Sequence, residues 1–272
     1  MDDEFFGAPE QQAMQRRGLA LYDLVGHDRA TTYYGRGVGM VWGSSDVTSD
    51  VTEQLQRLTT VLGVSSIAGV PEAEAPRLRA EIEAQGYTVT QYVNWEGGED
   101  ALAAAEATLA EHVLPVDLTA QVIDSMSPRA HLAALAKVSL EAGVLPVAGC
   151  ILRGRRRPGL GVVALDADGR GVSCAAASTY AHPDNAAFGP VAWWGMLATR
   201  PDRKGQRLAL ILGAMAMREM HARYGIRRFF TGVQPGNAPS EAVCTRMGLR
   251  PEGRATLTVV DPTVLPGGKM TR

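Results

Sequence analysis

The stretch that decides the fold is Trp193–Ala222, which reads WWGMLATRPDRKGQRLALILGAMAMREMHA. It begins as an apolar strand, turns at Arg200–Asp202 and Lys204–Gly205, and continues as a long apolar helix without a break. The start of a helix offers about four backbone N–H groups without intrahelical partners and a partial positive charge. Such a terminus favours anions, phosphate above all. The sequence therefore predicts an anion site here; the alternative is an ordinary strand–helix connection, because one glycine turn is weak evidence by itself.

The side chains around this turn suit a phosphate ligand. Gly205 lets the backbone approach a ligand closely, and Ala209 is small enough to leave the approach open. Arg203, Lys204 and Arg207 add positive charge beside the same turn. All three features are expected of an anion site, although surface charges beside a connection would look the same.

A second segment, Asn237–Leu249, contains a short helix and the start of a strand. Asparagine is a favoured N-cap and proline is tolerated in the first turn, so the helix is expected to begin at Asn237–Ser240. Gly248 ends it, and an apolar strand follows. The order strand, turn, helix, strand, helix, strand over this half of the chain indicates an α/β fold.

Hydrophobic periodicity and turn residues place the other elements. Helices are expected at Gln11–Leu24, Thr52–Leu62, Ala75–Gln85, Asp100–His112, Pro128–Ala142, Gln206–Ala222 and Asn237–Met247. Strands are expected at Tyr33–Trp42, Ser65–Val70, Thr88–Trp95, Val147–Leu152, Gly159–Leu165, Gly171–Tyr180, Pro190–Thr199, Ile226–Val233 and Arg254–Val260.

One spacing occurs twice along the chain. Gly63 and Gly86 are 23 residues apart, and so are Gly225 and Gly248. In each pair the first glycine separates a helix from a strand, and the second follows the next helix. We interpret this as two related α/β halves.

Together the two C-terminal segments resemble the GNAT superfamily of N-acetyltransferases. Its acyl-CoA motif is a strand, Pro, Arg/Gln-x-x-Gly-x-Gly/Ala and a helix, matched here by Pro201 and Lys204–Ala209, with Arg207 where glycine is common. The second motif is matched by Asn237, Ser240, Val243–Cys244 and Gly248–Leu249. The resemblance covers Pro128–Val260, and the motifs are specific jointly more than singly.

The resemblance implies a fold, a cofactor and a set of contacts. The fold is α/β (α+β), a mixed, mostly antiparallel sheet flanked by helices, with a degenerate domain at 1–124 and a catalytic domain at 125–272. Acetyl-CoA is the co-substrate, and an amine attacks its thioester directly. The pantetheine arm pairs with the strand, the pyrophosphate meets the N–H groups of the turn, and Asn237 and Ser240 line the thiol end. The residues expected to bind the cofactor are Leu197, Ala198, Thr199, Arg203, Lys204, Gly205, Gln206, Arg207, Leu208, Ala209, Asn237 and Ser240.

The groups that move protons are harder to assign. Family members often have a tyrosine where this chain has Cys244, and a glutamate on the strand before the turn, whereas Val191–Thr199 contains no acid. A thiol of ordinary pKa could protonate a leaving thiolate, so Cys244 is a candidate acid, although cysteine is commonly a small buried residue. His182 and Asp184 are candidate bases by sequence order, against the alternative of two polar loop residues.

The N-terminal half contains a similar glycine pattern, Arg36–Gly39. No helix follows it directly, and the aligned turn Ser44–Asp50 is acidic, so it lacks the basis for binding phosphate. This half is expected to wall the acceptor site or to support the C-terminal half.

Composition narrows the partners. The formal net charge is −2 and the pI is about 6.2, so nucleic acid and anionic membranes are not expected as partners. The three cysteines form no CxxC pair, which argues against a zinc site or a disulfide framework. The start of the chain lacks the pattern of a signal peptide, so a cytoplasmic protein is expected. The basic run Arg153–Arg157 is interpreted as a solvated loop, with a clamp for an anionic ligand as the alternative.

The main hypothesis is an acyl-CoA-dependent N-acyltransferase that acts on a small-molecule amine without a metal. The first alternative is a non-catalytic acyl-CoA-binding or interaction protein on the same fold. A nucleotide-binding protein is the second alternative, and it lacks the full P-loop pattern. The sequence leaves a homodimer, the acyl chain length and the acceptor's identity open.

Overall fold

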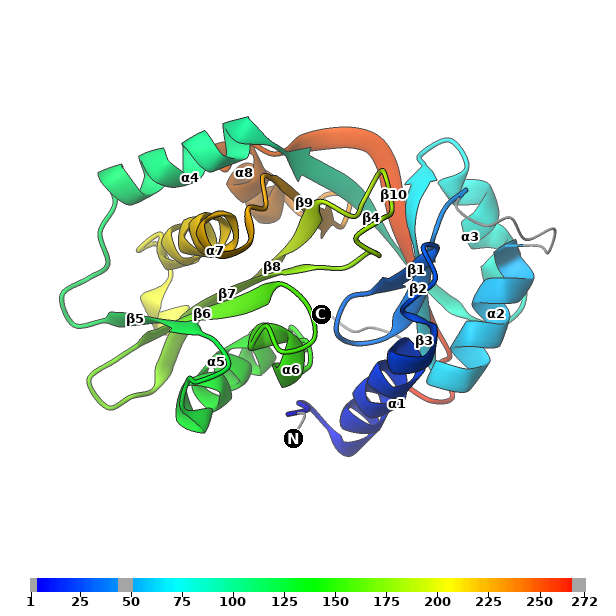
Figure 1. Ribbon diagram of the computed structural model, residues 1–272, viewed down its shortest axis with the longest axis horizontal. Coiled ribbons are helices and arrows are strands. Elements are labelled where there is room, and N and C mark those ends of the chain that lie inside the picture. The colour runs from blue at the N-terminus through cyan, green and yellow to red at the C-terminus, as the bar shows by residue number, and fades with distance from the viewer. Residues whose placement is uncertain (1–3, 44–50, 266–272) are drawn as a thin grey trace.

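One mixed sheet of ten strands runs through residues 4–43 and 51–265, the part of the chain that the computed structural model describes (Figure 1). The strand order is β1-β2-β3-β10-β4-β9-β8-β7-β6-β5. Its strands are β1 (Thr31–Tyr33), β2 (Val38–Val41), β3 (Val64–Pro71), β4 (Thr88–Gly97), β5 (Thr119–Ile123), β6 (Gly159–Leu165), β7 (Gly171–Thr179), β8 (Val191–Thr199), β9 (Arg228–Val233) and β10 (Arg250–Val260). The pairs β2–β3 and β8–β9 are parallel and the other named pairs are antiparallel, which confirms the predicted fold class.

Helices cover both faces of this sheet. They are α1 (Pro9–Val25), α2 (Val51–Leu62), α3 (Ala75–Glu83), α4 (Glu99–Glu111), α5 (Arg129–Glu141), α6 (Gly149–Leu152), α7 (Leu208–Tyr224) and α8 (Ala238–Arg246). Figure 1 shows α4, α7 and α8 on one side of the C-terminal strands and α5 and α6 on the other. Successive strand residues point to opposite faces, so Trp194 packs with α4, α7 and α8, whereas Trp193 packs on the α5–α6 side.

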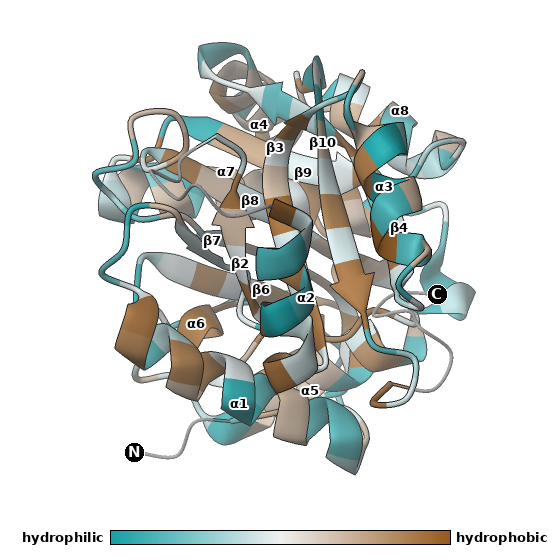
Figure 2. Ribbon diagram, turned by 90° about the vertical axis from the view of Figure 1, so that its right-hand side faces the viewer, coloured by the Kyte–Doolittle hydropathy of each residue, from teal (hydrophilic) through white to brown (hydrophobic). Residues whose placement is uncertain are grey.

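The helices of the N-terminal half bury one face each. Leu55 of α2, together with Leu78 and Ile82 of α3, packs on β3 and β10. Figure 2 shows the outward surfaces of α2 and α3 as largely hydrophilic. An apolar stripe on an otherwise polar helix is what docking on a sheet requires.

The two halves repeat one arrangement of elements, as the glycine spacing predicted. In the N-terminal half the order is α2, β3, α3, β4, and in the C-terminal half it is α7, β9, α8, β10. Gly63, Gly86, Gly225 and Gly248 precede the four strands with φ of 82°, 89°, 67° and 71°. Glycine adopts this left-handed conformation readily, so it can end a helix and redirect the chain into a strand.

Strands are exchanged between the halves. The C-terminal strand β10 lies between β3 and β4, and β4 in turn pairs with β9, with Asn94 opposite Gly232. The sheet is therefore continuous across position 124. The division into domains at 1–124 and 125–272 stays a prediction.

Several expected elements differ in the structure. The predicted strand Val147–Leu152 is wrong, because Gly149–Leu152 forms the short buried helix α6. A short apolar run fits a buried helix as well as a buried strand, so periodicity cannot separate the two. The predicted strand Tyr33–Trp42 is two antiparallel strands, separated by a turn at Gly35 with φ of 76°. Strand β5 had no sequence signal that we used.

The basic run Arg153–Arg157 is not a solvated loop throughout. The Arg153 side chain is 2% exposed and forms a bidentate ion pair with Glu4 at 2.6 and 2.9 Å. Arg157 donates to the carbonyls of Tyr33 and Thr179, and its guanidinium lies 4.3 Å from the Tyr22 ring centroid. Burial beside these partners makes the two arginines structural.

Among the described residues, no helix combines the length and apolarity needed to cross a membrane. No grouping of three or more His, Cys, Asp or Glu side chains suited to a metal ion occurs there either.

Candidate active site

The turn before α7 presents a row of unpaired backbone amides. A 3-10 turn at Pro201–Arg203 leads to α7, whose N-cap is Arg207. The first backbone hydrogen bond of α7 is donated by the Ile211 N–H to the Arg207 carbonyl at 3.0 Å. The backbone N–H groups of residues 205–210 donate to no group in the described part of the chain. Unpaired amides at the start of a long helix are able to hold an anion, as the sequence analysis expected of this turn. Anion binding here stays a prediction.

Two residues of the turn adopt the left-handed conformation. Gly205 has φ of 82°, and a Cβ atom added there would meet open space. Arg207 has φ of 58° and ψ of 17°, which a non-glycine residue rarely adopts. The backbone therefore has the shape that explains why glycine is common at the position of Arg207, and this chain reaches the same shape with an arginine.

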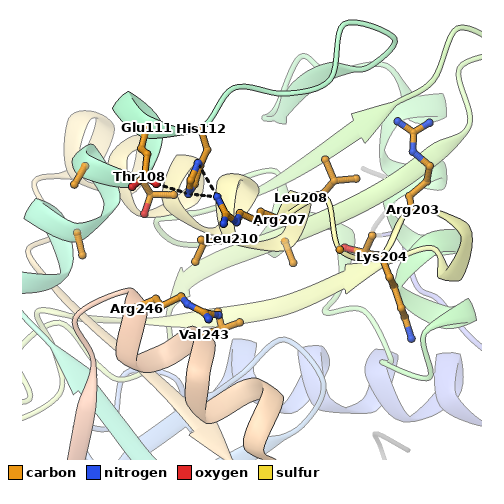
Figure 3. A pocket seen from close by; sticks show the side chains of 15 residues that line it. Thr108, Glu111, His112, Arg203, Lys204, Arg207, Leu208, Leu210, Val243 and Arg246 are labelled. Carbon is orange, nitrogen blue, oxygen red and sulfur yellow. Dashed lines mark hydrogen bonds and ion pairs between the residues drawn. The ribbon is translucent and has the colours of Figure 1, made fainter.

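A pocket of about 530 Å³ opens in front of these amides (Figure 3). Its walls come from the turn, α7, α8 and also α4, a helix of the N-terminal half. The lining residues are Ala104, Ala107, Thr108, Glu111, His112, Thr199, Arg203, Lys204, Gly205, Arg207, Leu208, Ala209, Leu210, Val243 and Arg246. The floor is apolar and the rim carries cations, as a ligand with a charged and an apolar part would need.

The four cations of the rim differ in how far their charge is neutralised. Arg203 is held by Asp117 at 2.7 Å, and Arg207 contacts the ring nitrogens of His112 at 3.2 and 3.3 Å. Lys204 and Arg246 are exposed and have no ion-pair partner among the described residues. Lys204 and Arg246 are thus the cations most available to an anionic ligand.

Strands β8 and β9 part before β8 reaches the pocket at Thr199. Their parallel pairing covers Val191–Trp193 and ends at Trp193 opposite Phe230, although both strands continue. Beyond that point β8 contains a bulge against β7, with Met196 at φ of 54°. A bulge bends its strand, so the edge of β8 after Trp193 is left without a strand partner on the β9 side.

Comparison with known proteins identifies this region. Residues 142–249 match the model of the acetyltransferase (GNAT) family. This part of the chain belongs to the GNAT family. A search of curated protein sequences finds no match.

Solved structures resemble nearly the whole chain. A GCN5-related N-acetyltransferase from Kribbella flavida has 16% identity and a TM-score of 0.57, covering 92% of this chain and 95% of that one. A tandem GNAT protein from the clavulanic acid biosynthesis pathway has 14% identity and a TM-score of 0.56, covering 95% and 98%. A Drosophila protein has 15% identity and a TM-score of 0.54, covering 93% and 89%. At these identities the likeness shows a shared tandem GNAT fold.

The structure brings part of the predicted cofactor set together in the GNAT region. Thr199 lines the pocket with the turn, while Leu197 packs toward α7 and Ala198 lies buried on the opposite face of β8. Asn237 caps α8 by accepting from the Ser240 N–H at 3.3 Å, and neither residue lines the pocket. Their cofactor contacts stay predictions.

Cys244 lies in the core of the GNAT region. It is 3% exposed and packs with Met247 and Leu249. Burial, followed by the nearby charge of Glu241, raises the pKa of the Cys244 thiol to about 12. A thiol with this pKa is a weaker acid than an ordinary thiol, so it would be a poor proton donor to the leaving CoA thiolate. The buried position therefore favours packing over proton transfer.

His182 and Asp184 lie in the loop between β7 and β8. The His182 Nδ1 accepts from the Asp184 N–H at 3.1 Å, and Asp184 forms an exposed ion pair with Arg29 at 3.7 Å. Neither lines the pocket, and their side chains already have local partners. Their assignment as bases stays a prediction.

Sequence reasoning missed the contribution of α4. Thr108 and Glu111 of α4, with His112 at its C-cap, line the pocket although they lie more than 80 positions before the turn. The alanine-rich pattern of α4 predicted a helix, and nothing in that pattern predicts which neighbour the helix contacts.

The N-terminal glycine pattern Arg36–Gly39 has a structural role. Arg36 donates to the Leu145 carbonyl, and burial lowers the pKa of Arg36 to about 10. The turn Ser44–Asp50 lies outside the described residues.

Proposed function

We propose that the protein is an acyl-CoA-dependent N-acyltransferase, most simply an acetyltransferase, that acts on a small-molecule amine. One observation carries the proposal. The unpaired amides of 205–210 face a pocket rimmed by Lys204 and Arg246, which suits a pyrophosphate. GNAT family membership of residues 142–249 supports the same activity.

The cofactor would run from the pocket toward the gap between β8 and β9. Its pyrophosphate would meet the turn, and the pantetheine arm would pair with β8 after Trp193 like an added strand. The thioester would then lie where the two strands separate, close to the bulge at Met196. This route explains why a strand edge stays unpaired in the middle of a sheet.

The chemistry proposed is direct attack of the amine on the thioester carbonyl. The chain would hold the pyrophosphate, align the acyl group in the gap and exclude water from it. Placing both reactants in one geometry can supply a large part of the rate enhancement. The buried Cys244 has no role in this scheme beyond packing.

Binding is tested by placing a competing charge at the helix start. In Ala209→Asp the new carboxylate would lie beside the free amides and repel phosphate, whereas the matched Ala209→Asn adds similar volume without charge. We expect Ala209→Asp to raise the Kd for acetyl-CoA at least about tenfold, and Ala209→Asn no more than about threefold. Isothermal titration calorimetry measures both, and an equal effect of the two variants would contradict the site.

Activity is tested by thiol release from acetyl-CoA with a panel of primary amines. Turnover on one or more acceptors supports the transferase. Tight binding without turnover on any amine would favour the non-catalytic acyl-CoA-binding protein, the alternative that the missing tyrosine at Cys244 and the acid-free strand β8 support.

A further inference from the structure

The sheet face opposite the pocket contains a polar cluster that no step above uses. It consists of Glu96 and Asn94 on β4, Glu252 and Thr256 on β10, and Tyr34 between β1 and β2. Thr256 donates to the Asn94 side-chain oxygen at 2.9 Å. The strand exchange brings these residues together, because β10 lies beside β4 only in the exchanged sheet.

One oxygen of this cluster lacks a partner. The Glu252 Oε1 is buried without a hydrogen-bond partner among the described residues, and the buried Tyr34 hydroxyl has only a weak contact with the Thr256 side chain. A buried polar atom left unpaired is costly, and in native proteins it needs an explanation such as a catalytic role or a ligand. The cluster is not sealed, since the Glu96 side chain is 15% exposed and Glu252 is half-buried.

The carboxylates differ in their surroundings. Glu96 accepts from Arg228 on β9 through both Nε and Nη2. Burial, followed by the charge of Glu96, raises the pKa of Glu252 from 4.5 to about 7, and Arg254 and Asn94 act in the opposite direction. Burial also raises the pKa of Tyr34 and of Tyr180, so both phenols stay neutral. Glu252 is therefore the group of this cluster that can exchange a proton near neutral pH.

The cluster lies level with the gap between β8 and β9. Glu96 pairs with Phe230 across β4–β9, and Phe230 pairs with Trp193 at the end of the β8–β9 ladder. One strand, β9, thus separates Glu96 from the gap, and Glu252 on β10 lies one strand further away. Neighbouring strands lie roughly 5 Å apart. The rings of Tyr34, Tyr180 and Phe230 pack together over the same place, with centroids 4.8 to 6.4 Å apart.

We propose that this cluster receives the ammonium group of the acceptor and that Glu252 is the general base of the reaction. The inference rests on the proposed transferase function. The cluster contains two carboxylates and two nearby arginines, Arg228 and Arg254, and Glu96 pairs with Arg228. The unpartnered Glu252 Oε1 is then the oxygen that can accept from an ammonium group, and the surrounding rings suit a primary amine on an apolar or aromatic body. The acceptor then approaches from the face opposite the cofactor, as attack on a thioester held in the gap requires.

The proton balance is simple. The ammonium loses one proton to the Glu252 carboxylate, which passes it to solvent beside the partly exposed Glu96. The free amine forms the C–N bond, the C–S bond breaks, and the second N–H proton ends on the CoA sulfur. The carboxylate pair thereby supplies the base that β8 lacks. Tyr34 binds the acceptor directly, because its hydroxyl oxygen accepts from the ammonium.

The test compares Glu252→Gln, Glu96→Gln and Tyr34→Phe with Glu10→Gln, an exposed glutamate on α1, as the control. Each is assayed with the amines that wild type acetylates, and acetyl-CoA Kd and thermal melting are measured in parallel. We expect Glu252→Gln to keep the acetyl-CoA Kd within twofold and to lose about 100-fold in kcat/KM at neutral pH. Tyr34→Phe should raise KM about tenfold with little change in kcat.

The pH profile gives a readout that misfolding would not imitate. Wild-type kcat/KM should rise through an inflection near pH 7, because Glu252 must be deprotonated to act. The inflection should be absent in Glu252→Gln and should move to lower pH in Glu96→Gln, which lacks the neighbouring charge. The role of Glu252 would be overturned if Glu252→Gln kept the kcat/KM of the wild type, or if the wild-type profile were flat around pH 7. Either result would leave the proposed transferase function standing. A protein that binds acetyl-CoA but acetylates no amine overturns the proposed function and this inference with it.

Discussion

At the scale of single residues, the cofactor turn reaches its shape against the preference of its sequence. Arg207 adopts a left-handed backbone that glycine would adopt without strain, and a left-handed non-glycine residue costs about 1 kcal/mol. The guanidinium of Arg207 contacts His112 at the rim of the pocket. The chain therefore has a cation at a position where the backbone conformation alone would favour glycine.

Two substitutions separate the strain at Arg207 from its charge. Arg207→Ala and Arg207→Gly both remove the cation, but Arg207→Gly also removes the strain. We expect Arg207→Gly to be more stable than Arg207→Ala by about 1 kcal/mol, measured by urea unfolding. Equal stabilities would show that the left-handed conformation is not strained in solution.

The raised pKa of Glu252 predicts a stability that depends on pH. The folded protein holds the Glu252 proton up to about pH 7, whereas the unfolded chain releases it near 4.5. The folded state therefore binds more protons in this window, and the free energy of unfolding falls as the pH rises from 4.5 to 7. We expect Glu252→Gln to melt higher than wild type at pH 8 and no higher at pH 5. A difference of equal size at both pH values would contradict the shifted pKa.

Cys244 should prove dispensable for chemistry. Its thiol stays protonated because burial raises its pKa to about 12. We expect Cys244→Ala to keep kcat within about threefold and to lose about 1 to 2 kcal/mol of stability from lost packing. Steady-state assays and chemical denaturation measure the two effects; a 100-fold loss of kcat with normal stability would restore Cys244 as a catalytic acid.

At the scale of elements, α4 takes part in the pocket although it comes from the N-terminal half. Ala104 of α4 lines the pocket, and its neighbour Ala103 is exposed elsewhere on the helix. Small residues on the pocket side leave room for a ligand between α4 and α8, which Figure 3 shows on either side of the turn.

Bulk on this side of α4 should block the cofactor. We expect Ala104→Phe to raise the acetyl-CoA Kd at least about tenfold, with Ala103→Phe as the control that carries the same loss of helix propensity, about 0.5 kcal/mol. Calorimetric titration measures both. Equal affinities in the two variants would place the ligand away from α4.

At the scale of the whole molecule, the strand exchange joins the two halves into one sheet. In the fragment 1–124, β4 would lose both of its strand partners and β3 would keep only β2. The fragment would also lose Ala255, Leu257 and Val259 from the cluster under α2 and α3. The halves thus correspond to repeated units of structure that complete each other.

We therefore expect neither 1–124 nor 125–272 to fold alone. The full chain should unfold in one cooperative transition, because the shared strands couple the halves. Circular dichroism of each fragment and calorimetry of the full chain test this. A fragment 1–124 with a cooperative melt of its own would show that β10 is not needed there.

The sequence by itself determined most of the local elements and predicted the anion site, because helix starts, left-handed glycines and hydrophobic periods depend on neighbours along the chain. The helix after Gly205 and the glycines at 63, 86, 225 and 248 needed no tertiary information. Only the tertiary structure decided which strands lie side by side, that α4 walls the pocket, and that Glu96 meets Glu252. Pairing between residues more than 150 positions apart depends on how complete surfaces pack, and no local pattern encodes that.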